Sequence, residues 1–354
     1  MRVAFLNPHS LRYYGGGEKW IIWVSNKLVE LGHHVEVFAL KYSPTGEYRI
    51  DNNSLQDLVK FKYQELDFKK GTLNPLRMKQ IPTIEADILY VTGGYYGFLT
   101  QAFHVKAIKV YGFHDPSLQN PENFLQKRIL RNIIPRFDLV HTLNDFQTKL
   151  LGTSEKICQI ENTYLYPLPV CREKFDKFTI LFYGQHEKSK GIDVVQNIID
   201  TIPDDIDFFI AGSGSESISS HSKDNVRILG FVDEKTLSEM LCKVHAVFFP
   251  SRSEASSLVA LESLAHCTPI IYRDIPQNSM LHAIPLCVSA ERDEDFLDLV
   301  MQLKKMYISD AQGYVNLCNT LPKFLMPSVE YMQKFLDMFT TLLQEKKRSQ
   351  NQKS

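Results

Sequence analysis

The chain has 354 residues, too many for one small hydrophobic core, so we expect two domains of similar size. Its 40 basic and 41 acidic residues leave a net charge of -1, which argues against a nucleic-acid partner. No apolar run approaches about 18 residues, and the apolar start of the chain is short. We therefore expect neither a membrane span nor a signal peptide.

In chain order, the first half alternates apolar strands with helical segments. A helix is predicted over residues 18–31, and residues 41–84 read as irregular. The predicted strands are 3–6, 35–40, 88–91, 108–111, 139–142 and 157–160. This half forms a predicted first domain over residues 1–165.

A proline-marked and charged connector, residues 166–177, precedes a second alternating set over residues 178–327. Its predicted strands are 179–183, 207–211, 226–229, 247–249 and 270–272. An amphipathic helix over 328–346 follows, which we expect to cross back to the first domain. The polar tail, 347–354, is expected to fray.

Strands that alternate with helices predict parallel sheets covered on both faces. The fold class is therefore α/β, with two doubly wound, Rossmann-like domains. Such sheets bind ligands at the carboxyl ends of their strands, so two of them facing each other predict an interdomain cleft.

Cysteine usage bears on compartment and metal binding. The scattered pattern, without a C-x-x-C pair, favours reduced, mostly buried thiols in a cytoplasmic protein over disulfides or a metal site. The six cysteines are Cys158, Cys171, Cys242, Cys267, Cys287 and Cys318.

Residues 250–262 carry the strongest functional signal. Glu254 and Glu262 lie eight positions apart, the first in a small-residue turn and the second inside an apolar helix. Between them, Ser256, Ser257 and Leu258 offer backbone N–H groups at a helix N-terminus, where an anion is favoured. This combination suits a sugar joined to a diphosphate. The alternative is a capped core helix with two solvated glutamates.

Glycines follow the first strand of the first domain. Gly15, Gly16 and Gly17 would let a ligand approach the backbone at the start of a helix. They form neither a Walker loop nor a dinucleotide-binding motif, and the alternative is a flexible turn.

His114 ends another strand of this domain and could donate to a phosphate or hydroxyl oxygen. Asp115 either orients His114 or caps the turn. Taken alone, His114 is as readily a structural turn residue.

The second domain repeats the pattern. Gln185 and Lys190 lie in a loop bounded by glycines after its first strand, where Lys190 supplies a charge for a diphosphate. The alternative is a solvated turn. Gly230 and Val232, and the stretch 212–214, are weaker candidates for contact with a base or ribose. The acidic stretches 205–207 and 293–295 look like metal–nucleotide motifs but read as structural.

Together these residues resemble the family 4, GT-B-fold retaining glycosyltransferases, over residues 1–272. The most specific match is the spacing of Glu254 and Glu262, with Pro250-Ser251 before it and Thr268-Pro269-Ile270 after it. Supporting motifs in the family's order are Gly15-Gly16-Gly17-Glu18, Gly32-His33, His114-Asp115, Lys190-Gly191 and Gly230-Phe231-Val232.

The resemblance implies a role for each matching residue. Glu254 would bind the transferred sugar and Glu262 the ribose, while Lys190 neutralises the diphosphate. Backbone N–H groups of Gly16, Ser257 and Leu258 would assist, and His114 would lie beside the reacting centre. It also implies a nucleotide diphosphate sugar as donor, retention of configuration, and no metal or other cofactor.

Three positions depart from the family's pattern. Gln185 replaces a usual arginine, for which His186 or Lys188 could compensate, and residues 255–257 lack a usual glycine. His245 replaces a common aspartate and reads as a surface change. The first two departures leave open a catalytically impaired nucleotide-sugar-binding subunit, and the fold leaves open a phosphorylase or synthase.

The acceptor would lie against the first domain, as a glycan, a lipid-linked sugar or a glycoconjugate. Residues 41–86 mix apolar and basic side chains, which favours either peripheral membrane contact or a solvated face over a small core. The residues concerned are Lys60, Phe61, Lys62, Tyr63, Phe68, Lys69, Lys70, Leu76, Arg77 and Lys79.

Overall fold

The computed structural model divides the chain into two compact units, Met1–Leu165 with Ser328–Ser354, and Tyr166–Pro327. The residues that it describes are 1–44, 46–67, 82–94, 96–119, 124–152, 154–171, 173–213, 218 and 223–352. Part of the basic and apolar stretch, residues 68–81, lies outside this description, as does Gly214.

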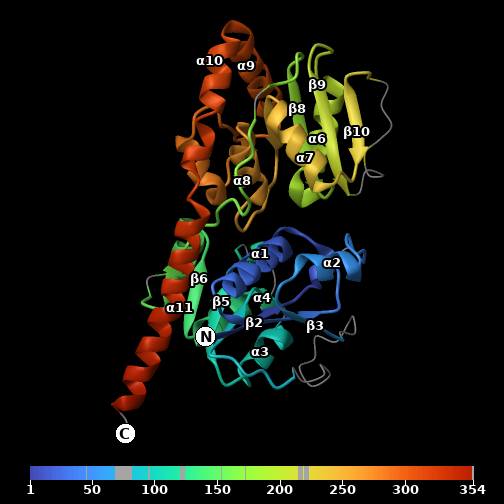
Figure 1. Cartoon of the computed structure of the whole chain (residues 1–354). Helices are drawn as coiled ribbons and strands as arrows, with labels where there is room; N and C mark the ends of the chain where they lie inside the picture. The colour runs from blue at the N-terminus through green and yellow to red at the C-terminus, as the bar shows by residue number, and fades with distance from the viewer. Residues whose placement is uncertain are drawn as a thin grey trace. The chain divides into compact units, whose positions relative to one another are not determined.

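The first unit contains a seven-stranded parallel sheet in the order β3-β2-β1-β4-β5-β6-β7 (Figure 1). Its strands are β1 (Arg2–Asn7), β2 (His34–Leu40), β3 (Lys62–Leu66), β4 (Ile88–Val91), β5 (Ile108–Gly112), β6 (Leu139–Thr142) and β7 (Ile157–Gln159). All strands point the same way, so the residues that follow β1, β4 and β5 gather at one edge.

Helices cover both faces of this sheet because successive residues of a strand point to opposite sides. Phe5 of β1 packs against Trp20 of α1, whereas Ala4 and Leu6 pack with Phe98 of α3. The helical segments are η1 (Leu11–Tyr13), α1 (Gly16–Glu30), α2 (Asn52–Leu58), α3 (Tyr96–Ala102), η3 (Pro116–Leu118), α4 (Phe124–Arg128), η4 (Ile129–Ile133), η5 (Ile134–Arg136), α5 (Asp145–Leu151) and α11 (Ser328–Asn351).

The last helix, α11, packs on the first unit although it follows the second in sequence. Trp20 Nε1 donates to the hydroxyl of Tyr331 at 2.8 Å, and Phe335 packs on Trp20 and Tyr90. The helix continues to Asn351, beyond the predicted end near residue 346. Within the described part of the chain, no helix is long and apolar enough to cross a membrane.

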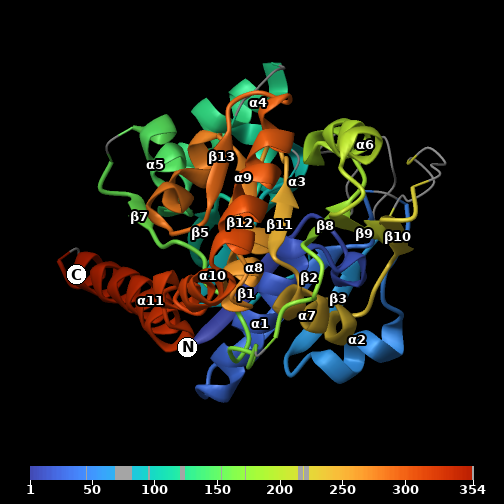
Figure 2. The ribbon, with the colours of Figure 1, turned by 90° about the horizontal axis from the view of Figure 1, so that it is seen from above.

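The second unit contains a six-stranded parallel sheet in the order β10-β9-β8-β11-β12-β13, which runs across Figure 2. The strands are β8 (Thr179–Gln185), β9 (Asp207–Ser213), β10 (Val226–Gly230), β11 (Ala246–Phe249), β12 (Ile270–Arg273) and β13 (Val288–Ala290). The helical segments are η6 (Lys188–Lys190), α6 (Ile192–Thr201), α7 (Glu234–Lys243), α8 (Leu258–Ala265), η8 (Pro276–Ala283), α9 (Asp295–Ser309), α10 (Ala311–Cys318) and η9 (Leu321–Phe324).

Alternation again divides this core between two faces. Phe182 and Phe248 pack on one face with residues of α6 and α9. Tyr183 and Phe249 pack on the other face with residues of α7 and α8. The fold class, two doubly wound α/β units, is thus the one predicted.

The sequence predicted residues 41–84 to be irregular, but this stretch contains α2 and β3. The short strand β13 was also not predicted. In β3, Tyr63 and Glu65 make hydrogen bonds to the loop after β1, and these tertiary contacts compensate for weak local patterning.

The prediction of six reduced thiols is wrong for one pair, because Cys171 and Cys242 form a disulfide. Cys171 lies on the connector and Cys242 in α7, 71 positions away, with a Cα–Cα separation of 5.0 Å. Sequence spacing carries no information on such a long-range approach. Of the remaining cysteines, Cys318 is buried and the other three are partly buried.

The sequence predicted His245 to lie at the surface, but this residue is fully buried. Its Nδ1 accepts from the backbone N–H of Thr179 at 3.0 Å, and its ring stacks on Phe178. Burial, reinforced by the positive charge of Lys174, lowers the pKa of His245 to about 3.

Candidate active site

In the second unit, the carboxylate of Glu254 is held by two neighbouring side chains. Lys190 Nζ lies 2.7 Å from Glu254 Oε1, and Ser251 Oγ donates to the same oxygen at 2.6 Å. The Glu254 side chain is 11% exposed and that of Lys190 is 30% exposed, so the pair lies at the margin of the solvent. Two residues that the sequence assigned to one ligand are therefore in direct contact.

A glycine allows the two loops that carry this pair to approach each other. Gly191, directly after η6, has φ +77°, and a Cβ built there would lie 2.5 Å from the carbonyl oxygen of Pro250. The backbone N–H of Arg252 also donates to the carbonyl of Ser189 at 2.8 Å. The loop after β8 and the loop after β11 thus form one packed unit.

Arg252 holds the loop after β11 in place through ion pairs with two aspartates. Its guanidinium donates to both carboxylate oxygens of Asp193, at 2.6 and 2.9 Å, and to Asp293 at 3.0 Å. Asp293 also accepts from Arg273 at the end of β12. Asp293 is accordingly structural, as predicted for its acidic stretch, and Asp207 likewise pairs with Lys177 at 2.6 Å.

Glu262 lies within α8, and its Oε2 accepts from the hydroxyl of Tyr183 at 3.0 Å. Tyr183, on β8, also donates to the carbonyl of Val259 at 3.1 Å. The carboxylate is therefore held at a definite position against the sheet. This contact contradicts the alternative in which Glu262 is merely solvated.

The N-terminus of α8 lies between the two glutamates in sequence. Ser257 is its N-cap, and the Ser257 side chain accepts from the N–H of Ala260 at 3.1 Å. The other N–H groups of a first helical turn, here including that of Leu258, have no acceptor within the helix. Residues 255–257 show no positive φ, so the missing glycine causes no backbone strain.

The remaining predicted residues of this unit lie at the carboxyl edge of its sheet. Gln185 is the last residue of β8, and Gly230 ends β10 with φ +65°. Val232 packs partly against the core, whereas the neighbouring Phe231 is 63% exposed. His186 is buried beside Phe182.

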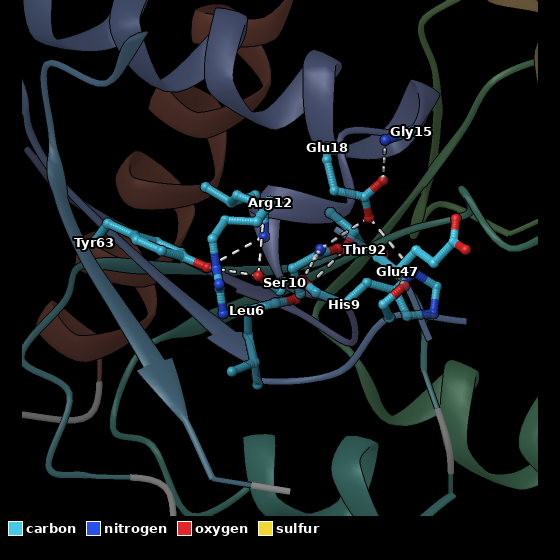
Figure 3. A network of polar contacts seen from close by, with 12 residues as sticks. Leu6, His9, Ser10, Arg12, Gly15, Glu18, Glu47, Tyr63 and Thr92 are labelled. Atoms are coloured by element: carbon cyan, nitrogen blue, oxygen red, sulfur yellow. Dashed lines mark hydrogen bonds and ion pairs between the residues drawn. The ribbon is translucent and has the colours of Figure 1, made fainter. Parts of the chain in front are cut away.

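In the first unit, the glycine turn is fastened by Glu18 (Figure 3). Gly15 is the N-cap of α1, and its N–H donates to Glu18 Oε2 at 3.1 Å. Glu18 Oε1 accepts from Asn7 at 3.2 Å and lies 3.4 Å from His9 Nδ1. A Cβ at Gly17 would meet nothing within 4 Å, so the backbone there borders open space.

The same loop is joined to β3 by a charged cluster (Figure 3). Arg12 donates through Nε and Nη2 to the two carboxylate oxygens of Glu65, at 3.1 and 2.9 Å. Burial alone would raise the pKa of Glu65, but hydrogen bonds from Arg12, Ser10 and Tyr63 lower it below its ordinary value. This cluster positions the loop after β1.

His114 follows β5 and is partly exposed. Its Nε2 lies 3.1 Å from the hydroxyl of Tyr90, and its ring centroid lies 4.3 Å from that of Trp20. Asp115 does not orient His114: its carboxylate caps η3 by accepting from the N–H of Ser117 at 2.9 Å. Burial, and secondarily His141, hold the pKa of His114 well below its ordinary value.

Comparison with known proteins relates part of this chain to a family and the whole chain to a fold. Residues 177–305 match the family model "Glycosyl transferases group 1". Anabaena HepE, solved with UDP and glucose, has a TM-score of 0.74 at 15% identity and covers 96% of this chain and 99% of its own. TarM of S. aureus has a TM-score of 0.71 at 13% identity, covering 96% and 100%. Residues 177–305 therefore resemble the group 1 glycosyltransferases, and the chain shares the GT-B fold of the HepE and TarM structures.

Two curated relatives match shorter segments of this chain. An uncharacterized 41.2 kDa protein from the cps region of Klebsiella pneumoniae is 32% identical over 102 residues, 28% of each chain. The processive diacylglycerol alpha-glucosyltransferase of Acholeplasma laidlawii is 32% identical over 95 residues, 25% of this chain and 28% of its own. The matched part thus spans less than a third of either relative.

Sequence reasoning assigned no role to three residues that shape the candidate site. Ser251 holds Glu254, Tyr183 holds Glu262, and Arg252 anchors the loop between them. Ser251 and Arg252 lie three and two positions before Glu254, so their closeness in the sequence was a usable signal. Tyr183 gave none, because its partner is 79 positions away.

Proposed function

We propose that this protein is a glycosyltransferase that moves a sugar from a nucleotide diphosphate sugar to an acceptor hydroxyl, with retention of configuration and without a metal. The observation that carries the proposal is the Lys190–Glu254 ion pair, with Ser251 on the same carboxylate oxygen, at the carboxyl edge of the second sheet. Cation, carboxylate and helix N-terminus together suit a sugar diphosphate better than a neutral ligand.

Departure of a nucleoside diphosphate builds negative charge on its terminal phosphate. Lys190 Nζ and the first N–H groups of α8 would stabilise that charge, which lowers the barrier most where donors are held in advance. Glu254 would accept hydrogen bonds from hydroxyls of the transferred sugar. Glu262, held by Tyr183, would accept from the ribose hydroxyls.

The retaining outcome is supported by the resemblance to family 4 and by the alpha-glucosyltransferase of Acholeplasma laidlawii among the relatives. For the donor, the support extends only to the class of nucleotide sugars, since HepE has been solved in complex with UDP-glucose. Isothermal titration with UDP, GDP, ADP and CDP tests the nucleotide, and a panel of their sugars with the preferred base identifies the donor. Binding to none of them would refute the proposal.

Two further measurements test stereochemistry and metal dependence. Proton NMR of the first product formed should show the anomeric configuration of the donor sugar, and the opposite anomer would refute retention. Turnover should survive extraction with EDTA. A loss that added Mg²⁺ or Mn²⁺ restores would refute metal independence.

Gln185 favours one competing function, a nucleotide-sugar-binding subunit with impaired catalysis. The nearby guanidinium of Arg252 is engaged by Asp193 and Asp293 and does not replace the missing arginine. Hydrolysis of bound donor without acceptor distinguishes the two functions. An enzyme releases free sugar slowly, whereas an impaired subunit binds the donor and leaves it intact.

For the acceptor, we propose a sugar, lipid-linked sugar or glycoconjugate bound by the first unit, with peripheral membrane contact through residues 41–86. In the described part of this stretch, Lys60 and Lys62 pair with Glu30 and Glu36 at 2.7 and 2.8 Å. Membrane contact therefore rests on the sequence of residues 68–81. Failure to co-sediment with acidic phospholipid vesicles would refute it.

A further inference from the structure

Three hydrogen bonds link His114 to a buried backbone carbonyl. The Nε2 of His114 lies 3.1 Å from the hydroxyl of Tyr90, and that hydroxyl lies 2.5 Å from Nδ1 of His141. The Nε2 of His141 then lies 3.0 Å from the carbonyl oxygen of Ile160. Tyr90 and His141 are both fully buried, so water does not compete for these contacts.

The carbonyl at the end of this chain determines the direction of every bond. A carbonyl oxygen only accepts, so Nε2 of His141 carries the proton and Nδ1 of neutral His141 is an acceptor. The hydroxyl of Tyr90 must then donate to His141. Its oxygen is left to accept from His114, whose proton is therefore on Nε2.

The electrostatic surroundings agree with neutral rings. Burial lowers the pKa of His141 to about 4 and holds that of His114 well below its ordinary value. Burial also raises the pKa of Tyr90 well above its ordinary value, so its hydroxyl keeps its proton. An imidazolium at either histidine would break the alternation of donors and acceptors.

We infer that Tyr90 and His141 are positioning residues that present Nδ1 of His114 as a bare lone pair, so that His114 receives a ligand hydroxyl rather than an anionic phosphate oxygen. This inference rests on the proposed function, which supplies hydroxyls from a sugar donor or acceptor. An oxygen of a diphosphate would meet the lone pair with repulsion, whereas a hydroxyl would donate to it. The sequence allowed His114 to donate to a phosphate or a hydroxyl oxygen, and this inference instead makes Nδ1 of His114 an acceptor.

Packing fixes the orientation of the His114 ring. The Trp20 ring lies against His114, and the Trp20 indole N–H is fixed by its hydrogen bond to Tyr331. Because His114 is partly exposed, a ligand can reach its Nδ1 from solvent, while Nε2 stays against the buried hydroxyl of Tyr90. Orientation and tautomer are therefore both determined by the fold.

The first test measures the tautomer in the ligand-free protein by ¹⁵N NMR, with the His114 signals assigned by their loss in His114→Gln. The expected result is protonated Nε2 and unprotonated Nδ1 at neutral pH. Tyr90→Phe should abolish this preference. Tyr111→Phe is the matched control on the adjacent strand, because the buried Tyr111 hydroxyl has no partner among the described residues. A proton on Nδ1 in the wild type would overturn the inference.

The second test changes His141, at the far end of the relay, which is the series of hydrogen bonds from His114 through Tyr90 and His141 to the carbonyl of Ile160. His141→Gln keeps one donating and one accepting atom and should retain the His114 tautomer, whereas His141→Leu should lose it. Near-ultraviolet circular dichroism checks that both variants are folded. Equal tautomer populations in the two variants would overturn the role of His141.

The third test asks which ligand atom meets His114, with UDP and UDP-glucose as calorimetric probes. His114→Phe should weaken UDP-glucose binding about tenfold, the worth of one hydrogen bond, and leave UDP binding unchanged, while His114→Gln should restore much of the loss. If the hydroxyl belongs to the acceptor, donor binding stays unchanged and the acceptor KM rises instead. Equal weakening of UDP and UDP-glucose would overturn the inference. Absence of all nucleotide binding in the wild type would refute the proposed function, and the tautomer measurement would remain decisive for the relay.

Discussion

Lys190 and Glu254 are 64 positions apart in the sequence, yet an ion pair of 2.7 Å joins them. Each was assigned to the donor, Lys190 to the diphosphate and Glu254 to the sugar. Their contact means that each side chain positions the other.

Removal of the lysine charge should therefore affect turnover more than folding. Lys190→Ala is expected to lower kcat on the order of 10²–10³-fold, because the charge that develops on the leaving group loses its nearest cation. The unfolding midpoint should change little, since a partly exposed ion pair contributes about 1 kcal/mol or less.

Lys243→Ala is the control, since Lys243 lies in the last turn of α7 with an exposed side chain. It should retain near-normal turnover in the same steady-state assay. Wild-type turnover in Lys190→Ala, or an equal loss in both variants, would contradict the assignment.

Two glycines with nearly the same backbone angle separate steric contact from backbone strain. Gly191 and Gly32 have φ of +77° and +81°, but only Gly191 faces a neighbour, the carbonyl of Pro250. Gly32→Ala should cost about 1–2 kcal/mol of unfolding free energy, the strain of a left-handed residue. Gly191→Ala should cost more, and it should also impair turnover because the lysine and glutamate loops separate. Equal losses of unfolding free energy, measured by urea denaturation, would show that the loop contact is unimportant.

The disulfide between Cys171 and Cys242 should stabilise the second unit. A cross-link over a separation of 71 positions is expected to contribute roughly 4 kcal/mol by restricting the unfolded chain. Non-reducing peptide mapping after alkylation should recover these two cysteines joined and the other four alkylated. Cys158→Ser is the control substitution and should leave the unfolding midpoint near that of the wild type, unlike Cys242→Ser. Alkylation of all six cysteines without reductant would contradict the pairing.

Acid should destabilise the protein through its buried histidines. The pKa of His141 is lowered to about 4 and that of His245 to about 3, whereas both would titrate near 6.5 when unfolded. The unfolded state therefore binds more protons between these values, and the unfolding free energy should fall as the pH drops from 6.5 toward 4. The loss is on the order of 3 kcal/mol for His141 alone.

Urea denaturation at a series of pH values measures this slope. His245→Asn, which keeps an acceptor for the N–H of Thr179, should flatten the dependence. His34→Ala should not, because the His34 side chain is 61% exposed. A stability independent of pH between 6.5 and 4 would contradict the burial of neutral histidines.

The sequence alone predicted the alternation of strands and helices, because hydrophobic periodicity is a local property. It also predicted that Lys190, Glu254 and Glu262 follow or flank strands, since parallel strands end at one edge of a sheet. The motifs that contain these residues are short and contiguous in the sequence, so they can be recognised without the structure. The same reasoning placed His245 at the surface, because burial depends on residues distant in the sequence.

Only the tertiary structure decided which side chains touch. The Lys190–Glu254 pair, the Cys171–Cys242 disulfide and the relay from His114 to Ile160 all join residues brought together by the sheets. Such contacts depend on strand order and register, which no local pattern encodes. The sequence by itself thus determined the fold class and the chemical types at the sheet edges. The structure decided their partners and, for His114, which nitrogen contacts the hydroxyl of Tyr90.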